Sequence, residues 1–399
     1  MNRKSTNILG PIFIVAGTTI GAGMLAMPLT SSSAGFLWTS LYLVFLWIGM
    51  LSSALLTVEL NLANKETLTI YGLSQKYLNK LGGTLGSLSL MLLFVSLLAA
   101  YASGGSSILY EFFDQKFDTH TLTILFVILF GGWITISMKS ADYINRLLFI
   151  AMIVGFVIIM GSLSSEISIG YLSRKEPFSL SHLSMIPVLF TTLGVHGSIP
   201  SIMKYVGQDR SKIYKIFIIG SGIPLFIYMC WQAIALGIIP LTGDNSFETI
   251  QQSKNALGTF VAILGTQSSS TAFEFLTEFF TFFAISTSFL GVGISLFDFY
   301  GEVFGKTFGK HRITLSMMTF VPSLIIALYV PHAFIFALEF AALALAVLAI
   351  LLPCVILYKM HKKAIIKPTA LVTKRWFVFG LYLFGLFITT IVINTLMTG

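Results

Sequence analysis

The sequence predicts an all-α integral membrane protein in which eleven transmembrane helices form two five-helix repeats of inverted topology plus one final helix. The composition excludes a soluble globular chain: of 399 residues, 56% are hydrophobic and 10% are charged, and the mean hydropathy is +0.89. Glycine and proline also interrupt two of the apolar stretches. Unwound backbone at membrane depth persists only where it is buried in protein or lines a cavity, so the interruptions indicate a ligand site near the bilayer midplane.

Eleven apolar stretches are long enough to cross about 30 Å of hydrocarbon with roughly 20 residues each. They lie near residues 8–34, 36–62, 84–110, 121–139, 147–165, 183–206, 214–238, 270–299, 313–330, 333–357 and 376–397. The basic segment MNRKSTN precedes the first stretch, but no small-residue cleavage site follows. We therefore expect a membrane span there rather than a removed signal peptide.

The lysine and arginine positions predict a cytoplasmic amino terminus and a periplasmic carboxy terminus. In that orientation only Lys116, Arg174, Lys175 and Lys254, of 24 basic residues, lie on the outer side. Such asymmetry follows the positive-inside rule. The net charge of +8 is then explained by loops beside anionic lipid, so the bilayer is the expected partner. No nucleic acid and no obligate protein partner is inferred.

The first interruption is GTTIGAG, from Gly17 to Gly23, with Pro28 downstream. Glycine forfeits backbone entropy in a helix and threonine competes for backbone hydrogen bonds, so the helix is expected to break here. Close packing through Gly17 and Gly21 is the structural alternative. Three glycines and two threonines in seven residues favour the break.

The second interruption is TTLGVHGSIPS, from Thr191 to Ser201, in the sixth stretch. Five spans separate the two interruptions, and an odd number makes the second repeat enter the membrane from the opposite side. The expected organisation is a first repeat at 1–168, an inverted second repeat at 169–358, and a cytoplasmic loop with span 11 at 359–399.

The two breaks together predict recognition of a zwitterion. A half-helix that begins near Gly21 offers free N–H groups and a positive dipole end to a carboxylate. The half-helices that end near Gly17 and Gly194 offer free carbonyl groups to an ammonium. No charged side chain is required for this recognition.

Three ionisable side chains within the spans have open interpretations. His196, in the second interruption, either hydrogen-bonds a backbone carbonyl or contacts substrate and handles a proton. Glu59 and Glu339 are single carboxylates among apolar neighbours, so each is protonated or paired. Pairing is favoured for Glu59, and for Glu339 pairing and titration stay open.

Hydroxyl groups in AISTSFLGVG of span 8 form a second candidate site. Ser286, Thr287 and Ser288 either bond back to the preceding turn or face unwound carbonyls near Ala16 and Thr19. The second arrangement would give oxygen ligands for sodium. No carboxylate flanks the hydroxyls, so we expect weak sodium affinity at most. If a proton is the coupling ion, His196 or Glu339 is the favoured titrating group.

No nucleotide, metal or catalytic motif is recognised. GEVFGKT has three residues between its glycines where a phosphate loop needs four. Cys230 and Cys354 lie in different spans and give neither a disulfide framework nor a metal-ligand spacing. The ionisable groups form no catalytic constellation, and the sequence has no repeated filter or charged pore ring. We therefore expect neither an enzyme nor a channel, and no cofactor.

In the outer loop 242–269, ALGTFVAILG is too short to span and is expected to act as a lid.

Four motifs resemble the hydroxy/aromatic amino acid permeases, and the resemblance covers nearly the whole chain. They are IFIVAGTTIGAGMLAMPL at 12–29, IPVLFTTLGVHGSIPSI at 186–202, FIIGSGIPL at 217–225 and TSFLGVGISLFD at 287–298. The resemblance implies a bacterial inner-membrane importer of the amino acid/polyamine/organocation superfamily, with the leucine-transporter fold and proton symport. Tyrosine is the implied substrate; sodium coupling, tryptophan and other neutral amino acids remain alternatives.

The resemblance also implies a set of site residues. The implied backbone and second-break residues are Thr18, Thr19, Gly21, Ala22, Gly23, Leu193, Gly194, Val195 and His196. By analogy with the fold, Tyr101 and Phe283 are candidates for the walls of the side-chain pocket, and Ser286 of span 8 is a further substrate-binding candidate. The coupling-ion candidates remain Ala16, Thr19, Thr287, Ser288, Glu339 and His196.

Overall fold

The structure is a computed structural model that describes every residue except 1–7, 65, 175, 268–270, 309–310 and 399. The described residues form helices and connecting segments, without a strand among them. The α-helices are α1 (Leu9–Thr19), α2 (Gly23–Ser31), α3 (Gly35–Leu62), α4 (Ile70–Phe112), α5 (Thr119–Ile136), α6 (Met138–Leu163), α7 (Ile169–Leu172), α8 (Ile186–Thr192), α9 (Ile199–Val206), α10 (Arg210–Ile238), α11 (Phe247–Gln252), α12 (Ala256–Gly265), α13 (Thr271–Phe308), α14 (Arg312–Tyr329), α15 (Ala333–Ala346), α16 (Leu352–Lys362) and α17 (Arg375–Thr398).

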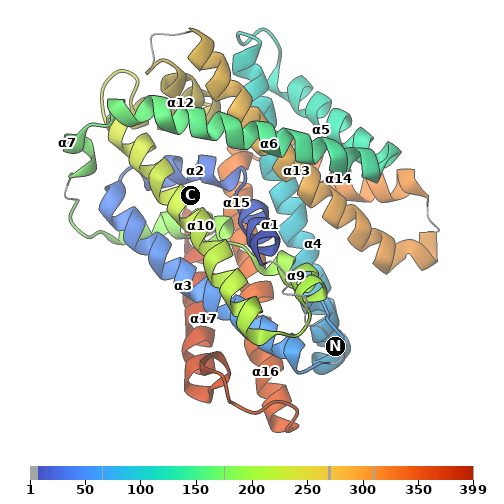
Figure 1. Ribbon diagram of the computed structural model, residues 1–399. Coiled ribbons are helices and arrows are strands. Elements are labelled where there is room, and N and C mark those ends of the chain that lie inside the picture. Colours follow the sequence, from blue (N-terminus) through green and yellow to red (C-terminus); the bar gives the residue numbers. More distant parts are fainter. Residues whose placement is uncertain (1–7, 65, 175, 268–270, 309–310, 399) are drawn as a thin grey trace.

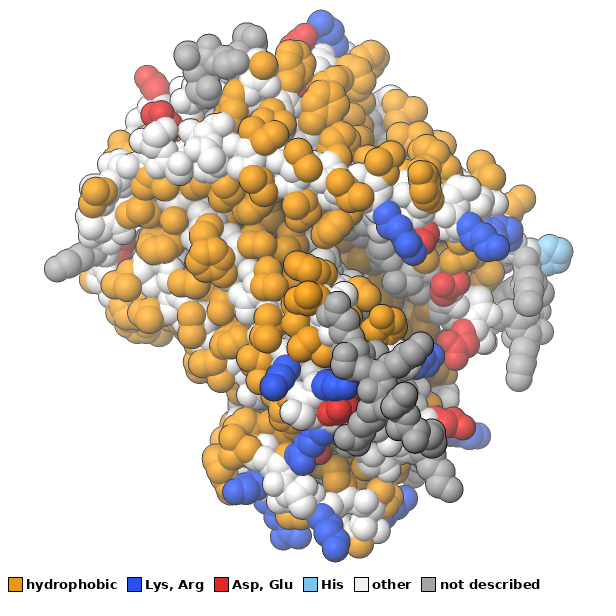
Figure 2. Space-filling model, in the orientation of Figure 1, with side chains coloured by type: hydrophobic (Ala, Val, Ile, Leu, Met, Phe, Trp, Pro, Cys, Tyr) orange, Lys and Arg blue, Asp and Glu red, His pale blue; other side chains and the backbone are white. Residues whose placement is uncertain are grey.

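The predicted spans are confirmed. Among the described residues, ten helical segments are long and apolar enough to cross a membrane, and the bent pair α1–α2 makes up to eleven. Their outer faces are apolar: Leu147, Ile150, Val154 and Val157 on α6 are each more than half exposed and follow a helical period. Figure 2 shows hydrophobic side chains over most of the visible surface, and lysines and arginines gathered at its lower end, as expected for a membrane protein.

The bent pair α1–α2 lies in the middle of the molecule in Figure 1, where α2 contacts α10 and α15. Helix α10 packs along α1 and also contacts α2, so it touches both halves of the broken span. Helix α4 packs against α13, α14 and α15. The core of the protein is therefore built around an irregular segment rather than around a continuous helix.

Both predicted interruptions are confirmed as helix breaks. Helices α1 and α2 meet at an angle of 52° across residues 20–22. In the sixth span, α8 ends at Thr192, and a 3-10 turn at His196–Ser198 precedes α9. Pro200 occupies the second position of α9, where the missing N–H is tolerated.

The first break is shorter than the expected segment from Thr18 to Gly23. Helix α1 continues through Thr19 because the hydroxyls of Thr18 and Thr19 donate to the carbonyl of Val15, at 3.0 and 2.8 Å. These side chains thus bond within the helix rather than unwind it.

Three further features shape the fold. Helix α4 begins at Ile70, before the predicted span at 84–110, and has a left-handed residue at Asn79. A π-helical turn at Val347–Leu351 joins α15 to α16 within one span. The apolar stretch ALGTFVAILG, predicted to be too short to span, forms the short helix α12, which packs against α2, α4 and α13. The GEVFGKT segment is part of helix α13, which agrees with its rejection as a phosphate loop.

Candidate functional site

The first break leaves backbone N–H groups without partners. The Ala22 amide donates to Ser288 Oγ on α13, at 2.9 Å. Among the described residues, the amides of Gly21 and Gly23 make no hydrogen bond. Both lie at the start of α2, where the helix dipole is positive. This end of the break therefore suits a carboxylate.

The other ends of the two breaks leave carbonyl groups without donors. Because the Gly21 and Ala22 amides do not close the last turn of α1, the carbonyls of Gly17 and Thr18 lack their helical donors. In the second break, the carbonyls of Leu193 and Gly194 accept no hydrogen bond from a described residue. Such carbonyls carry the negative end of the helix dipole and suit an ammonium group.

A buried tyrosine connects the two breaks. Tyr228, on α10, is fully buried, and its hydroxyl lies 2.7 Å from the carbonyl oxygen of Thr19 and 3.2 Å from that of Thr192. One phenolic proton is thus shared between the end of α1 and the end of α8. This residue fixes the distance between the two half-helices.

Two further side chains surround the first break. Ser288 Oγ accepts from the Ala22 amide and donates to the Ala284 carbonyl at 2.8 Å. The hydroxyl of Tyr101, on α4, faces Ser288 and Tyr228. The predicted wall residue Tyr101 therefore lies beside the breaks, together with Tyr228, which the sequence did not single out.

The glycines of the first break permit close packing as well as unwinding. A Cβ atom on Gly21 would lie 2.7 Å from Ser288 Oγ, and one on Gly23 would lie 2.6 Å from Thr192 Cγ2. Gly23 thus brings the start of α2 directly onto the end of α8. Because Gly23 has no side chain, the two breaks can lie in direct contact at this point.

The breaks are accessible from one side only. Thr18 and Gly197 are exposed, whereas every residue of α2 from Gly23 to Leu29 is buried. Helix α2 contacts α8, α10, α11, α12 and α15, and α1 packs mainly along α10. The exposed residues of the breaks therefore lie on the side of α1 and α9, and those on the α2 side are buried.

His196 lies beside α3 without a firm hydrogen bond. Its ring faces the backbone of Ser53, yet neither ring nitrogen reaches hydrogen-bond geometry with a described residue, and both are buried. The Ser53 hydroxyl donates to the carbonyl of Ala349 in the π-helical turn. The imidazole is therefore positioned by packing, and its nitrogens are available to a ligand or a proton.

The two intramembrane glutamates differ. The carboxylate of Glu59 accepts from Tyr214 Oη at 2.8 Å and pairs with Arg210 Nε at 2.6 Å, which confirms the predicted pairing. Glu339, on α15, is partly buried and has no ion pair or hydrogen bond with a described residue. Its neighbour Leu338 accepts a hydrogen bond from Thr191 at the second break, at 3.0 Å.

The remaining candidates on α13 are dispersed around the helix. Thr287 Oγ1, like Ser288 Oγ, donates to the Ala284 carbonyl, at 3.1 Å. At about 100° per residue, Phe283 and Ser286 lie on the opposite side of α13 from Ser288. Phe283 instead contacts the rings of Phe279 and Phe282. The structure does not bring Phe283 and Ser286 to the breaks.

The proposed oxygen ligands for a cation are also in use. The Ala16 carbonyl accepts from the Ile20 amide at 3.0 Å, and the Thr19 carbonyl accepts from Tyr228. Two amides and three carbonyls at the breaks remain without a hydrogen bond from a described residue: the amides of Gly21 and Gly23, and the carbonyls of Thr18, Leu193 and Gly194. A zwitterion requires donors and acceptors of this kind.

Comparison with known proteins agrees with this geometry. The model of the tryptophan/tyrosine permease family matches residues 4–393. The chain is 35% identical to tyrosine-specific transport system 1 of Haemophilus influenzae, over 89% of this chain and 88% of that protein. It is 28% identical to the tryptophan-specific transport protein of the same organism, over 91% and 90%, and 28% identical to the low affinity tryptophan permease of Escherichia coli, over 90% and 89%. The chain belongs to the tryptophan/tyrosine permease family and is a multi-pass membrane transporter of that family rather than an enzyme.

Proposed function

We propose that this protein imports an aromatic L-amino acid, with tyrosine as its principal substrate, by proton symport and alternating access. The observation that carries the proposal is the meeting of two helix breaks, one with unpaired amides and both with unpaired carbonyls, around Tyr228. Paired breaks of this kind occur where transporters bind substrate.

The amino acid's charged groups bind to backbone groups. Its carboxylate takes the amides of Gly21 and Gly23 at the start of α2. Its ammonium takes carbonyls of Thr18, Leu193 and Gly194. Because the breaks are largely enclosed, these charge-assisted hydrogen bonds form with little competition from water.

The aromatic side chain extends toward Tyr101 and His196, where a phenolic hydroxyl meets polar groups. Tyrosine is favoured over tryptophan because the relatives named as tyrosine-specific are 35% and 32% identical, against 28% for the tryptophan-specific protein of the same organism. The proposed site comprises Thr18, Thr19, Gly21, Ala22, Gly23, Tyr101, Leu193, Gly194, Val195, His196 and Tyr228. It leaves out Phe283 and Ser286.

Alternating access follows from an inverted-repeat arrangement of the spans. We assign 1–168 and 169–358 to the two repeats, with α1–α2 and α8–α9 as equivalent broken spans. The amino terminus is assigned to the cytoplasm of a bacterium and the carboxy terminus to the periplasm. The exposed side of the breaks, toward α1 and α9, would then face the cytoplasm, and we assign the conformation as inward-facing on that basis.

A proton is the proposed coupling ion. His196 has two buried nitrogens without partners, and Glu339 has no counter-ion among the described residues. Unpaired ionisable groups at membrane depth are the usual elements of proton relays. Sodium is the alternative, with Thr287 and Ser288 as its ligands, although each of these hydroxyls donates to a backbone carbonyl.

Transport by purified protein in liposomes tests the proposal. We expect an inward proton gradient, in sodium-free buffer, to concentrate labelled L-tyrosine inside the liposomes. Unlabelled tyrosine should drive counterflow of the labelled form, which a channel cannot support. Tryptophan and phenylalanine, added as competitors, rank the substrates.

Two results would contradict parts of the proposal. Accumulation that needs a sodium gradient and is lost in Thr287→Ala would replace the proton with sodium. Counterflow driven by tryptophan but not by tyrosine would change the principal substrate.

A further inference from the structure

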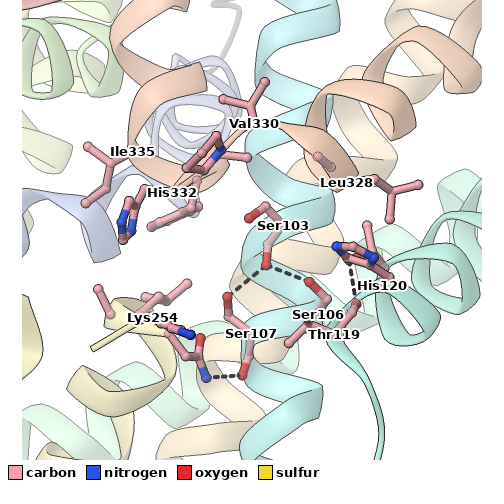
Figure 3. A pocket seen from close by; sticks show the side chains of 18 of the residues that line it. Ser103, Ser106, Ser107, Thr119, His120, Lys254, Leu328, Val330, His332 and Ile335 are labelled. Atoms are coloured by element: carbon pink, nitrogen blue, oxygen red, sulfur yellow. Dashed lines mark hydrogen bonds between the residues drawn. The ribbon is translucent and has the colours of Figure 1, made fainter. Parts of the chain in front are cut away.

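A cavity lies away from the helix breaks, where the starts of α5, α12 and α15 meet α4. Its volume is about 300 Å³, at the lower end of the range of roughly 300–1000 Å³ for small-molecule sites. Figure 3 shows His332 and His120 on opposite sides of this cavity, with Ser103, Ser106 and Ser107 between them and Lys254 nearby. We call it the basic cavity.

The basic cavity has one lysine and two histidines among its lining side chains and no acidic ones. Lys254, His120 and His332 line it from three separate segments, and its lining includes neither aspartate nor glutamate. In the described part of the chain, none of these three side chains has an ion pair or a hydrogen bond. A lysine without a counter-ion, flanked by two imidazoles whose N–H groups can donate hydrogen bonds, suits a carboxylate.

The nearby carboxylates are engaged elsewhere. Glu111 Oε1 accepts from Asn255 Nδ2 at 2.7 Å. Asp118 caps α5 by accepting from the Thr121 amide at 3.2 Å. Both side chains lie outside the lining, so they hold the walls of the basic cavity rather than occupy it.

Backbone groups add to the positive character. Two helices, α12 and α15, begin at the basic cavity, and neither Asn255 nor His332 caps its helix with a side chain. The hydroxyls of Ser106 and Ser107 both donate to the Ser103 carbonyl at 2.9 Å, so they supply acceptors rather than protons. The uncapped amides and the three basic side chains are therefore the donors that face an anion.

An apolar wall separates the basic cavity from the helix breaks. Leu29, Leu257 and Phe334 line it and are almost completely buried. A Cβ atom on Gly104 of α4 would lie 2.9 Å from the Phe334 ring, so this ring packs directly on the helix that carries Tyr101. The two sites thus lie on the same helix, less than about two turns apart, with Phe334 between them.

We propose that the basic cavity is a second, weaker binding site for the transported aromatic amino acid. Lys254, His120 and His332 hold its carboxylate, and Leu29, Leu257 and Phe334 contact its ring. This inference rests on the proposed function for the identity of the ligand. In the proposed orientation the basic cavity opens to the periplasm, so it receives the substrate before Phe334 moves and admits it to the breaks.

Equilibrium binding to the purified full-length chain in nanodiscs tests the proposal. The probe is labelled 3-(4-hydroxyphenyl)propionate, which has the ring and carboxylate of tyrosine but lacks the ammonium that the breaks require. We expect it to bind weakly, to be displaced by L-tyrosine, and not to be displaced by tyramine, which has no carboxylate.

Variants locate that binding. The double substitution Lys254→Gln/His332→Gln should weaken probe binding by about fivefold or more, because partly exposed ionic contacts are individually weak. The single substitution Lys254→Arg, with His332 unchanged, keeps the positive charge and should retain most of the affinity for the probe. Lys116→Gln, which removes an exposed outer-loop lysine paired with Asp114, is the matched control and should leave probe binding unchanged.

Three outcomes would overturn the proposal: no probe binding, probe binding unaffected by Lys254→Gln/His332→Gln, or displacement of the probe by inorganic phosphate as readily as by tyrosine. A different result would contradict the proposed function: no tyrosine counterflow in liposomes, although the probe still binds and its binding still depends on Lys254. Tight tyrosine binding at the breaks, measured in the same variants, reports whether each protein is folded.

Discussion

Replacing Gly23 with alanine is the most informative perturbation of the helix breaks. The added methyl group would lie 2.6 Å from Thr192 Cγ2. Non-bonded carbon atoms prefer about 3.5–4.0 Å, so α2 and α8 must separate locally by about 1 Å. Because the Gly23 amide is one of the proposed carboxylate donors, this displacement falls directly on the binding site.

The size of the effect follows from the cost of overpacking. An extra methyl group in a well-packed interior costs about 1–3 kcal/mol. Each 1.4 kcal/mol is about tenfold in affinity. We therefore expect Gly23→Ala to weaken tyrosine binding by about fivefold to a hundredfold while the protein still inserts and elutes as a folded species.

A second substitution relieves the clash. Thr192→Ser removes Cγ2 but keeps the hydroxyl that donates to the Leu189 carbonyl and the carbonyl that accepts from Tyr228. The nearest remaining Thr192 atoms would then lie at 3.4 and 3.7 Å, close to ordinary contact. The double variant Gly23→Ala/Thr192→Ser should recover most of the affinity.

Scintillation proximity binding of labelled tyrosine to detergent-purified protein measures these affinities. Gly222→Ala is the matched control, since a Cβ atom there would meet nothing within 4 Å. Normal affinity in Gly23→Ala, or failure of Thr192→Ser to rescue it, would refute the contact between the two breaks as the determinant of binding.

Three other substitutions test single side chains. Tyr228→Phe removes a hydroxyl that two buried carbonyls share, at a cost of about 1–3 kcal/mol; we expect a lower melting temperature that saturating tyrosine partly restores, and equal ligand-free melting temperatures would contradict this. His196→Ala should reduce proton-driven tyrosine uptake with little change in melting temperature, since its nitrogens have no protein partner to leave unpaired; unchanged uptake across pH would return it to a structural role. Arg210→Gln should lower the melting temperature, because Glu59 is left buried without its cation, and the free energy of unfolding should fall by about 1–3 kcal/mol. Adding Glu59→Gln should restore part of the lost stability.

The spans could be predicted from sequence because crossing a hydrocarbon layer imposes length and composition together. The extension of α4 to Ile70 could not, since that part does not need to be apolar. Thr69 caps it, its Oγ1 accepting from the Gly72 amide at 3.2 Å. The π-helical turn at Val347–Leu351 was also missed, although Pro353 follows it in the same run. Proline lacks the N–H that would bond back to the Ala349 carbonyl, so the sequence did carry a local signal for a distorted turn.

The helix breaks were predictable because glycine and proline act on the local backbone. Their extent was not, because Thr18 and Thr19 turn their hydroxyls back to Val15 and prolong α1. Tyr228 was missed because a tyrosine within a span indicates only that its hydroxyl needs a hydrogen-bond partner when it is buried. The identity of that partner depends on how α10 packs, which is tertiary information.

For Phe283 and Ser286 a usable signal was present in the sequence. Both were chosen by residue type, within the same helix as Ser288. The helical period places them on the far side of that helix from Ser288, so the three side chains cannot all face one break. Residue type proposes candidates for a binding site, and periodicity then decides which of them share a face.

The single hydroxyl of Tyr228 gives the two breaks a physical means of communication. It has one proton, and the carbonyls of Thr19 and Thr192 both lie within hydrogen-bond distance of it. Each carbonyl therefore keeps an acceptor lone pair that an ammonium group can use. An ammonium group in the proposed site, on the carbonyls of Thr18, Leu193 and Gly194, would lie beside these two carbonyls and would join α1 and α8 through the ligand as well as through Tyr228 on α10. Binding in the proposed site would thus add a second connection between the two half-helices. Helix α1, which packs mainly along α10, is the element whose position this added connection would alter most.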